Sequence, residues 1–456
     1  MALHVTDKLF VVAGASSLFQ LIDVCLELNI VSTESINNTF DNTCDSFMFS
    51  FGDRLGKDKD KKKEWPKYVK HQLKALDEYI SKPYMQSPNR FMYVDSGGFQ
   101  IQMNYLNNED IPDFMDSFDI FLRLAKNKIH YAFSLEVSPS TKFSSKYQEV
   151  LDLNLKSYNQ HARLPDEFRK KILSIYHFRT PKCLEIWRKV LIDTELYKKF
   201  SVWSIGGMAA NSQIVQVDRP PLYSCAVADI IRYELNKGNK EVYVHILGTS
   251  SEFDLVLVSL MKRYAKKYHD VTLIITMDSS KVAQQICLGR FNDIIMPNGQ
   301  IDRIELSSKE MNVTDRDGVS SIDKYNQVIV PALNIYGNKF NTVTDFYYQE
   351  GHPRAGSIMH EVSLANMLYV LHYMQTLYTT IDSKVEILEN CIDDEDYIDQ
   401  MNKIMSFKSN KTITAKGRKQ VLSYRNVEKV IRECDPEYNA AIISASIPAN
   451  IEIVNT

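Results

Sequence analysis

The chain has 456 residues, long enough for one large domain and a smaller one, and its 44% hydrophobic content fits a globular protein that buries a core. Its formal net charge of −3 excludes a globally positive surface, so any nucleic-acid site must be a local patch. The longest apolar runs, such as VTLIIT (271–276), are strand-length and too short to cross a bilayer.

The N-terminus has a short apolar run preceded by Asp7 rather than by a basic cluster, which indicates a first strand instead of a signal peptide. Seven cysteines are scattered, with no C-x-x-C or C-x-C pair, so a zinc ribbon is not expected. We therefore expect a cytoplasmic protein whose reduced cysteines mostly pack as small hydrophobes.

Eight short apolar, β-branched or aromatic runs follow one another, with amphipathic segments such as 253–268 between several of them. An open doubly wound sheet usually has fewer strands and a glycine fingerprint after the first, which AGASS (13–17) does not provide. The pattern therefore predicts an α/β fold with a closed parallel (β/α)8 TIM barrel. Its strands are expected at 9–14, 47–51, 91–98, 130–137, 172–178, 202–207, 242–248 and 271–280.

The alternation fades after about residue 300, so we expect a barrel over 1–300 and a mixed, partly helical C-terminal appendage over 301–456. A long helix is expected at 357–381. The tail carries a basic cluster, which is either a solvated tail helix or a contact with nucleic-acid phosphates. Its members are Lys408, Lys411, Lys416, Arg418 and Lys419.

Polar residues or glycines stand at the ends of five predicted strands: Asp95, Glu136, His177, the pair Gly206–Gly207, and Asp278. Each alone could be a helix cap or a turn residue. In a barrel, however, all these ends open on one face, where active sites are built from several strands. Together they predict a site on that face.

The segment YVDSGGFQIQ (93–102) combines a carboxylate, two glycines and an aromatic residue. The glycines have no Cβ, so a flat ligand could approach the backbone closely, and Phe99 could stack on its ring. Two separate carboxylates, Asp95 and Asp278, suit the division into acid/base and nucleophile that breaks a glycosidic bond with retention.

Four motifs, DSGGFQ (95–100), IGGMA (205–209), HILGTSSEFDL (245–255) and MDSS (277–280), resemble in order and spacing those of the tRNA-guanine transglycosylases. These enzymes are (β/α)8 base exchangers, and the resemblance covers roughly residues 90–285. It implies that Asp278 is the nucleophile that attacks the sugar C1′. It implies that Asp95 moves the proton between the leaving and the incoming base.

The same resemblance implies a base pocket. Ser96 and the segment Gly206–Gly207–Met208 would bind the base edge, Phe99 would stack on the base, and Glu136 aligns with the family's base-reading aspartate. His177 and Phe178 stand where the family usually has glutamine and glycine, which puts the exact base specificity in question.

Two further departures point to one branch of the superfamily. The segment after Asp278, SSKVAQQICLGR, lacks the arginine-bearing loop that reads an anticodon. The family's zinc-binding run is missing, and its histidine falls at Ala365, so we expect no metal and no other cofactor. A transglycosylase core without these parts is most similar to the DNA-modifying (DpdA-type) enzymes of phages and bacteria.

The expected function is therefore the exchange of guanine in DNA for a 7-deazaguanine, a base related to queuosine. If the chain is phage-encoded, we expect the reaction in the host cytoplasm. The partners would be DNA and a free cyano- or amidino-type 7-deazaguanine. The guanine would be flipped out, with phosphate contacts from the tail cluster, Lys281 and Arg290. A tRNA enzyme, a non-catalytic partner subunit and a hydrolytic N-glycosidase remain alternatives.

Overall fold

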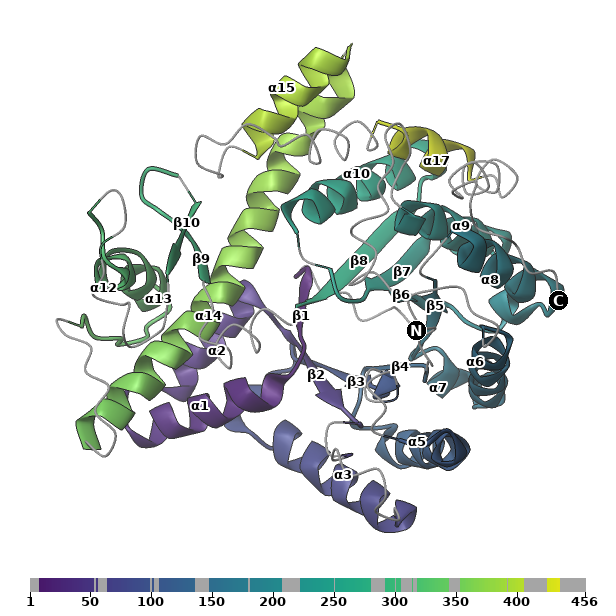
Figure 1. Cartoon of the computed structure of the whole chain (residues 1–456), viewed down its shortest axis with the longest axis horizontal. Coiled ribbons are helices and arrows are strands. Elements are labelled where there is room, and N and C mark those ends of the chain that lie inside the picture. Colours follow the sequence, from purple (N-terminus) through teal and green to yellow (C-terminus); the bar gives the residue numbers. More distant parts are fainter. Residues whose placement is uncertain are drawn as a thin grey trace.

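The computed structural model is a closed barrel of eight parallel strands in the order of the chain, surrounded by helices (Figure 1). β1 pairs with both β2 and β8, and the β1–β8 ladder closes the ring. The predicted (β/α)8 fold is confirmed. The structure describes residues 8–52, 55, 64–98, 101, 106–135, 147–178, 181–206, 222–249, 251–279, 292–299, 301–304, 314, 318–343, 353–391, 393–405 and 425–434.

Each predicted barrel strand corresponds to one observed strand. The strands are β1 (Phe10–Val12), β2 (Ser46–Ser50), β3 (Phe91–Asp95), β4 (Tyr131–Phe133), β5 (Ile172–His177), β6 (Val202–Gly206), β7 (Glu241–Ile246) and β8 (Thr272–Ser279). The helices around them are α1 (Ala15–Glu27), α2 (Thr33–Thr43), α3 (Trp65–Ile80), α5 (Ile111–Ala125), α6 (Tyr147–Ala162), α7 (Asp166–Arg169), α8 (Pro181–Asp193), α9 (Leu222–Asn236) and α10 (Glu252–His269). Three short 3₁₀ turns are η1 (Pro83–Met85), η2 (Asn108–Asp110) and η3 (Leu196–Lys198).

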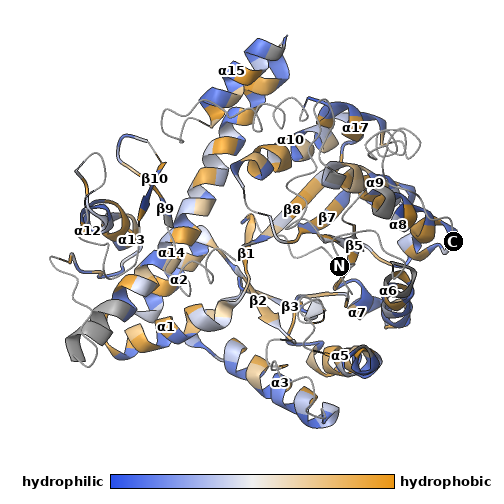
Figure 2. Ribbon diagram, in the orientation of Figure 1, coloured by the Kyte–Doolittle hydropathy of each residue, from blue (hydrophilic) through white to orange (hydrophobic). Residues whose placement is uncertain are grey.

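Alternation along the strands divides the buried side chains into two cores. In β3, Phe91 and Tyr93 belong to the cluster inside the barrel, whereas Met92 and Val94 pack in the layer between strands and helices. Because both faces are buried, the strands are mainly hydrophobic, as Figure 2 shows for β7 and β8. The position of every second residue therefore decides which side chains line the interior.

The C-terminal region is built around the long helix α14 (Pro353–Lys384), which lies between the barrel and a small group of elements (Figure 1). α14 contacts α1, α2 and α10 on the barrel side and β9 and α13 on the other. The elements of this region are β9 (Asn292–Ile295), β10 (Ile301–Ile304), α12 (Ser321–Lys324), the π-helix η5 (Tyr325–Ile329), α13 (Val330–Asn334), η6 (Val385–Asn390), α15 (Asp394–Ile404) and α17 (Val427–Glu433). The long helix expected at 357–381 lies within α14.

The expected boundary at residue 300 falls inside a hairpin, because β9 and β10 pair across it in an antiparallel ladder. The hydroxyl of Tyr369 in α14 accepts a hydrogen bond from the backbone N–H of Ile295 in β9, at 3.1 Å. Ile294 and Ile304 from the hairpin share one continuous hydrophobic core with the barrel helices and α14.

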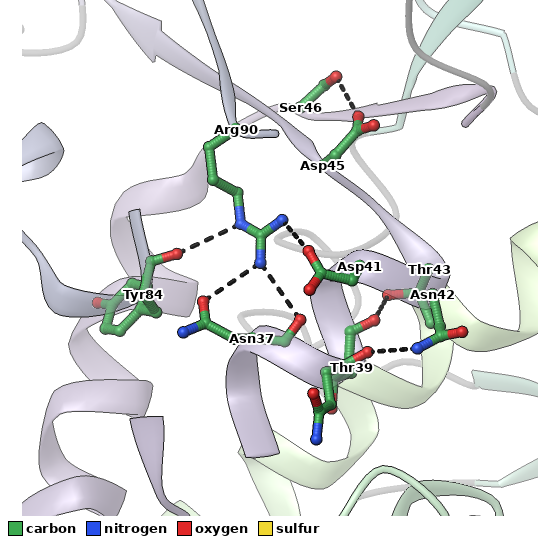
Figure 3. A network of polar contacts seen from close by, with 10 residues as sticks. Asn37, Thr39, Asp41, Asn42, Thr43, Asp45, Ser46, Tyr84 and Arg90 are labelled. Atoms are coloured by element: carbon green, nitrogen blue, oxygen red, sulfur yellow. Dashed lines mark hydrogen bonds and ion pairs between the residues drawn. The ribbon is translucent and has the colours of Figure 1, made fainter. Parts of the chain in front are cut away.

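A buried arginine organises the amino end of the barrel, opposite the expected site (Figure 3). Arg90 directly precedes β3 and its Nη1 lies 2.5 Å from Oδ1 of Asp41 in α2. Its other nitrogens donate to the carbonyl and side-chain oxygens of Asn37, both at 3.2 Å, and to the carbonyl of Tyr84 at 3.3 Å. These bonds join α2, η1 and β3 at one point.

Candidate active site at the carboxyl end of the barrel

Asp278 stands near the carboxyl end of β8, at an inward position. It alternates with Ile274, which belongs to the interior cluster, and with the buried Thr276. Its Oδ1 accepts a hydrogen bond from the backbone N–H of Gly248, which follows β7. Among the described residues, Oδ2 accepts no hydrogen bond, and the side chain is 14% exposed. Of the two carboxylate oxygens, only Oδ1 is thus held by a donor from the described part of the chain.

Asp95 is the last residue of β3 and continues the inward series of Phe91 and Tyr93. The Ser50 hydroxyl donates a hydrogen bond of 2.8 Å to Oδ2 of Asp95. The two residues are also partners in the β2–β3 ladder. Since the strands are parallel, Asp95 and Asp278 both lie at the carboxyl end of the barrel, on its inner side.

The first of the two glycines after Asp95 has a structural reason that the sequence did not reveal. Gly97 has a φ of +89°, and a Cβ at this position would lie 2.7 Å from the Cα of Gly52 and 2.9 Å from its nitrogen. Gly52 follows β2, so the exits of β2 and β3 touch through their backbones. Close approach by a ligand was the predicted reason; the neighbour that the structure describes for Gly97 is Gly52.

Ser96, predicted to bind the base edge, is only 1% exposed, and its Oγ has no hydrogen-bond partner among the described residues. A buried hydroxyl without a partner costs about 1–3 kcal/mol, so such groups call for an explanation. Ser96 directly follows Asp95, the last residue of β3.

The other predicted pocket residues are described in part. Gly206 ends β6 and is the ladder partner of His177 at the end of β5, where only the backbone is described. Both therefore lie at the same end of the barrel as the two aspartates. Phe178 is fully buried and packs edge-on against Tyr176. The predicted residues Phe99, Glu136, Gly207, Met208, Lys281, Arg290, Lys408, Lys411, Lys416, Arg418 and Lys419 lie outside the described residues.

The sequence reasoning missed a line of polar side chains beneath Asp278. The Nε2 of His245 lies 3.8 Å from Oδ1 of Asp278, and its Nδ1 lies 2.8 Å from Oγ1 of Thr276. The same Oγ1 lies 2.8 Å from the hydroxyl of Tyr243, which is 2.5 Å from the hydroxyl of Tyr93. Inward-facing residues alternate along a strand, so they can be found by counting back two positions at a time. Counting from Asp278 gives Thr276, and counting from Leu247 gives His245 and Tyr243.

Aromatic rings pack against this line of polar side chains and help to bury it. The imidazole of His245 meets the Phe133 ring at a centroid distance of 4.9 Å and an angle of 65°, and Tyr131 stacks on Tyr243 at 5.0 Å. Burial raises the pKa of Tyr93 and of Tyr243 well above their usual range. Both phenols are therefore neutral hydrogen-bond donors at physiological pH.

The described residues contain no group of three or more histidine, cysteine, aspartate or glutamate side chains arranged to hold a metal ion. Ala365, where the family's zinc-binding histidine was expected to fall, is buried in α14. Four of the described cysteines, Cys25, Cys44, Cys225 and Cys434, are buried, and burial raises the pKa of each thiol to about 12. These thiols pack as apolar side chains.

No protein-family model matches the chain, and no curated protein is significantly similar to it in sequence. Among the described helices, none combines the length and the apolar character needed to cross a membrane. The case for a function therefore rests on the residues at the carboxyl end of the barrel.

Proposed function

We propose that this chain is a base-exchanging transglycosylase of the tRNA-guanine transglycosylase superfamily that replaces guanine in DNA with a 7-deazaguanine. The observation that carries the proposal is the state of Asp278. Oδ1 is fixed by the Gly248 N–H, and Oδ2 accepts no bond from the described residues, at the end of a barrel that also presents Asp95. A held carboxylate with one open oxygen suits nucleophilic attack on a sugar carbon.

In the first half-reaction, Oδ2 of Asp278 attacks C1′ of the target nucleotide. The C1′–N9 bond breaks, its electron pair goes to guanine N9, and Asp95 delivers a proton to the leaving base. The product is a glycosyl ester on Asp278, of the kind formed by retaining glycosidases. Ser50 orients Asp95 for this transfer through the hydrogen bond to Oδ2.

In the second half-reaction, Asp95 takes a proton from the incoming 7-deazaguanine, and the base nitrogen attacks C1′. The C1′–O bond to Asp278 breaks, and its electron pair returns to the carboxylate. Two displacements at C1′ retain its configuration. The target nucleotide must leave the base stack first, since C1′ and the base edge are not reachable inside a duplex.

The assignment to DNA rather than tRNA rests on the sequence after Asp278, which lacks the arginine-bearing anticodon loop of the tRNA enzymes. Retention of both aspartates supports an enzyme over a non-catalytic subunit. The buried Ser96 hydroxyl, which lacks a hydrogen-bond partner among the described residues, supports a polar ligand beside Asp95. Hydrolysis would use the same carboxylates, with water in place of the incoming base.

The test mixes the protein with labelled 7-deazaguanine and, separately, duplex DNA, single-stranded DNA or bulk tRNA. We expect label in DNA and a protein–DNA adduct that survives a denaturing gel. Asp278→Asn should abolish both, and Asp95→Asn should lower exchange by about 100-fold or more. Asp193→Asn, an exposed aspartate at the end of α8, is the matched control and should leave both unchanged.

Three other outcomes would revise the proposal. Label in tRNA alone would assign the tRNA reaction to the same residues. Release of guanine without uptake of label would indicate a hydrolase. An adduct that persists in Asp278→Asn would remove the nucleophile assignment altogether.

A further inference from the structure

The carboxylate of Asp278 favours one of the two directions that the hydrogen bonds beneath it can take. A carboxylate attracts an N–H and repels a nitrogen lone pair, which favours the proton on the Nε2 of His245, its buried neighbour at 3.8 Å. The Nδ1 of a neutral imidazole is then an acceptor, and the Thr276 hydroxyl must donate to it.

The same logic continues downward. Once the Thr276 proton points at His245, Oγ1 can only accept from the Tyr243 hydroxyl, and the Tyr243 oxygen then accepts from Tyr93. Four side chains from three strands thus point their protons toward Asp278. Bonds that are aligned in this way in a dry interior polarise one another and fix one tautomer of the imidazole.

We propose that His245 is a positioning residue for Asp278, a neutral imidazole in the Nε2–H form that hydrogen-bonds Oδ1 as the reaction proceeds. The Nε2 of His245 is fully buried and has no hydrogen-bond partner in the described part of the chain. A buried N–H without an acceptor is costly, and Oδ1 of Asp278 is the acceptor beside it.

The distance of 3.8 Å is beyond hydrogen-bond range, so this contact is open in the ligand-free protein. Hydrogen bonds in active sites are often long without substrate and shorten in the complex. The inference therefore requires the distance between Nε2 and Oδ1 to shorten in the substrate complex.

The inference rests on the proposed function. It predicts that the loss of His245 affects the rates of the two half-reactions unequally. In the ester, Oδ1 becomes the carbonyl oxygen, and donors from Gly248 and His245 stabilise the negative charge that returns when the C1′–O bond breaks. Loss of His245 should therefore slow the breakdown of the ester more than its formation.

The kinetic test compares His245→Leu with His245→Gln, whose side-chain amide keeps an N–H donor. For His245→Leu we expect exchange to fall by about 10- to 100-fold, in the range for a lost hydrogen bond to a charged group. The fraction of protein trapped as the DNA adduct should rise at the same time. His245→Gln should recover part of the rate and a lower adduct fraction.

His269→Leu is the matched control. His269 also uses a ring nitrogen in a hydrogen bond, at 2.6 Å from the carbonyl oxygen of Ile431, but on the outside of the barrel. It should change stability without changing the ratio of adduct to turnover. Equal losses of adduct and turnover in His245→Leu, with no recovery in His245→Gln, would overturn the positioning role.

An independent measurement needs no substrate. In protein labelled with ¹⁵N-histidine, the signals missing from His245→Leu belong to His245, and at neutral pH they should report the neutral Nε2–H tautomer. The Nδ1–H tautomer or an imidazolium would overturn the inference. A wild type that forms no adduct but shows the Nε2–H tautomer would refute the proposed function while upholding the hydrogen-bond direction.

Discussion

Ser50 and Asp95 are partners twice, in the β2–β3 ladder and through a 2.8 Å hydrogen bond from the Ser50 hydroxyl to Oδ2 of Asp95. The ladder places the two side chains next to each other at the end of neighbouring parallel strands. The hydrogen bond then fixes the orientation of the carboxylate. Ser50, which no sequence motif marked as a site residue, thus supports the proposed general acid/base.

Replacing Ser50 by alanine should lower base exchange by about 10- to 150-fold, because hydrogen bonds to charged groups contribute about 1.5–3 kcal/mol. The adduct on Asp278 should still form. The assay is the initial rate of label uptake into DNA. Ser204→Ala is the matched control, since Ser204 is buried in β6 and its Oγ has no hydrogen-bond partner among the described residues. Equal rates in Ser50→Ala and wild type would remove Ser50 from the site.

Gly97→Ala should destabilise the fold by about 2–4 kcal/mol, because it combines backbone strain with overpacking. The new Cβ would meet the Gly52 backbone at 2.7 Å, and φ is +89°. Gly238→Ala is the matched control: its φ is +80°, but a Cβ there meets nothing within 4 Å. It should cost only about 1 kcal/mol. Urea unfolding measures the free energy of unfolding of both variants. Equal losses would show that the Gly52 backbone shifts to accommodate the new Cβ.

Arg90→Gln should lower the free energy of unfolding by about 2–3 kcal/mol, because it breaks the pair with Asp41 and removes donors from the part-buried oxygens of Asn37 and the buried carbonyl of Tyr84. The comparison is Arg123→Gln in α5, whose pair with Asp119 is on a helix surface and whose side chain is 49% exposed. That change should cost less than about 0.5 kcal/mol. Thermal or urea unfolding decides, and similar losses would refute an organising role for Arg90.

Stability should fall between neutral and mildly acidic pH because of His161 in α6. Burial, together with the nearby Arg123 charge, lowers the pKa of His161 from 6.5 to about 4. The unfolded chain therefore binds this proton first as the pH drops. The contribution is fully present above about pH 6.5 and is lost progressively down to about pH 4.

The measurement is the free energy of unfolding in urea at about pH 7.5 and about pH 5, where the His161 contribution should decline by about 2 kcal/mol. Other groups titrate in this range, so the quantity to compare is the difference between wild type and His161→Gln. The variant should show a correspondingly smaller decline. Identical pH dependence in the two proteins would mean that His161 is not buried in its neutral form.

The barrel was predictable because eight apolar segments at regular spacing have few other ways to bury both faces. The strand ends were less predictable. A strand was expected over 91–98, but β3 stops at Asp95, because the positive φ of Gly97 is incompatible with an extended strand. His245 and Ser50 were missed for a different reason. Their relation to Asp278 and Asp95 comes from strand register, which brings together residues that are 33 and 45 positions apart in the chain.

The contact between α1 and α14 also has a consequence for folding during synthesis on the ribosome. α1 (Ala15–Glu27) is made near the start of synthesis, whereas α14 (Pro353–Lys384), which packs against it, comes near the end. At about 5–20 residues per second, the ribosome takes roughly 20–70 s to make the chain between them. During this interval the apolar surface of α1 that α14 will cover has no partner. A ribosome that stalls after the barrel has been made would leave a nascent chain with that surface open to aggregation.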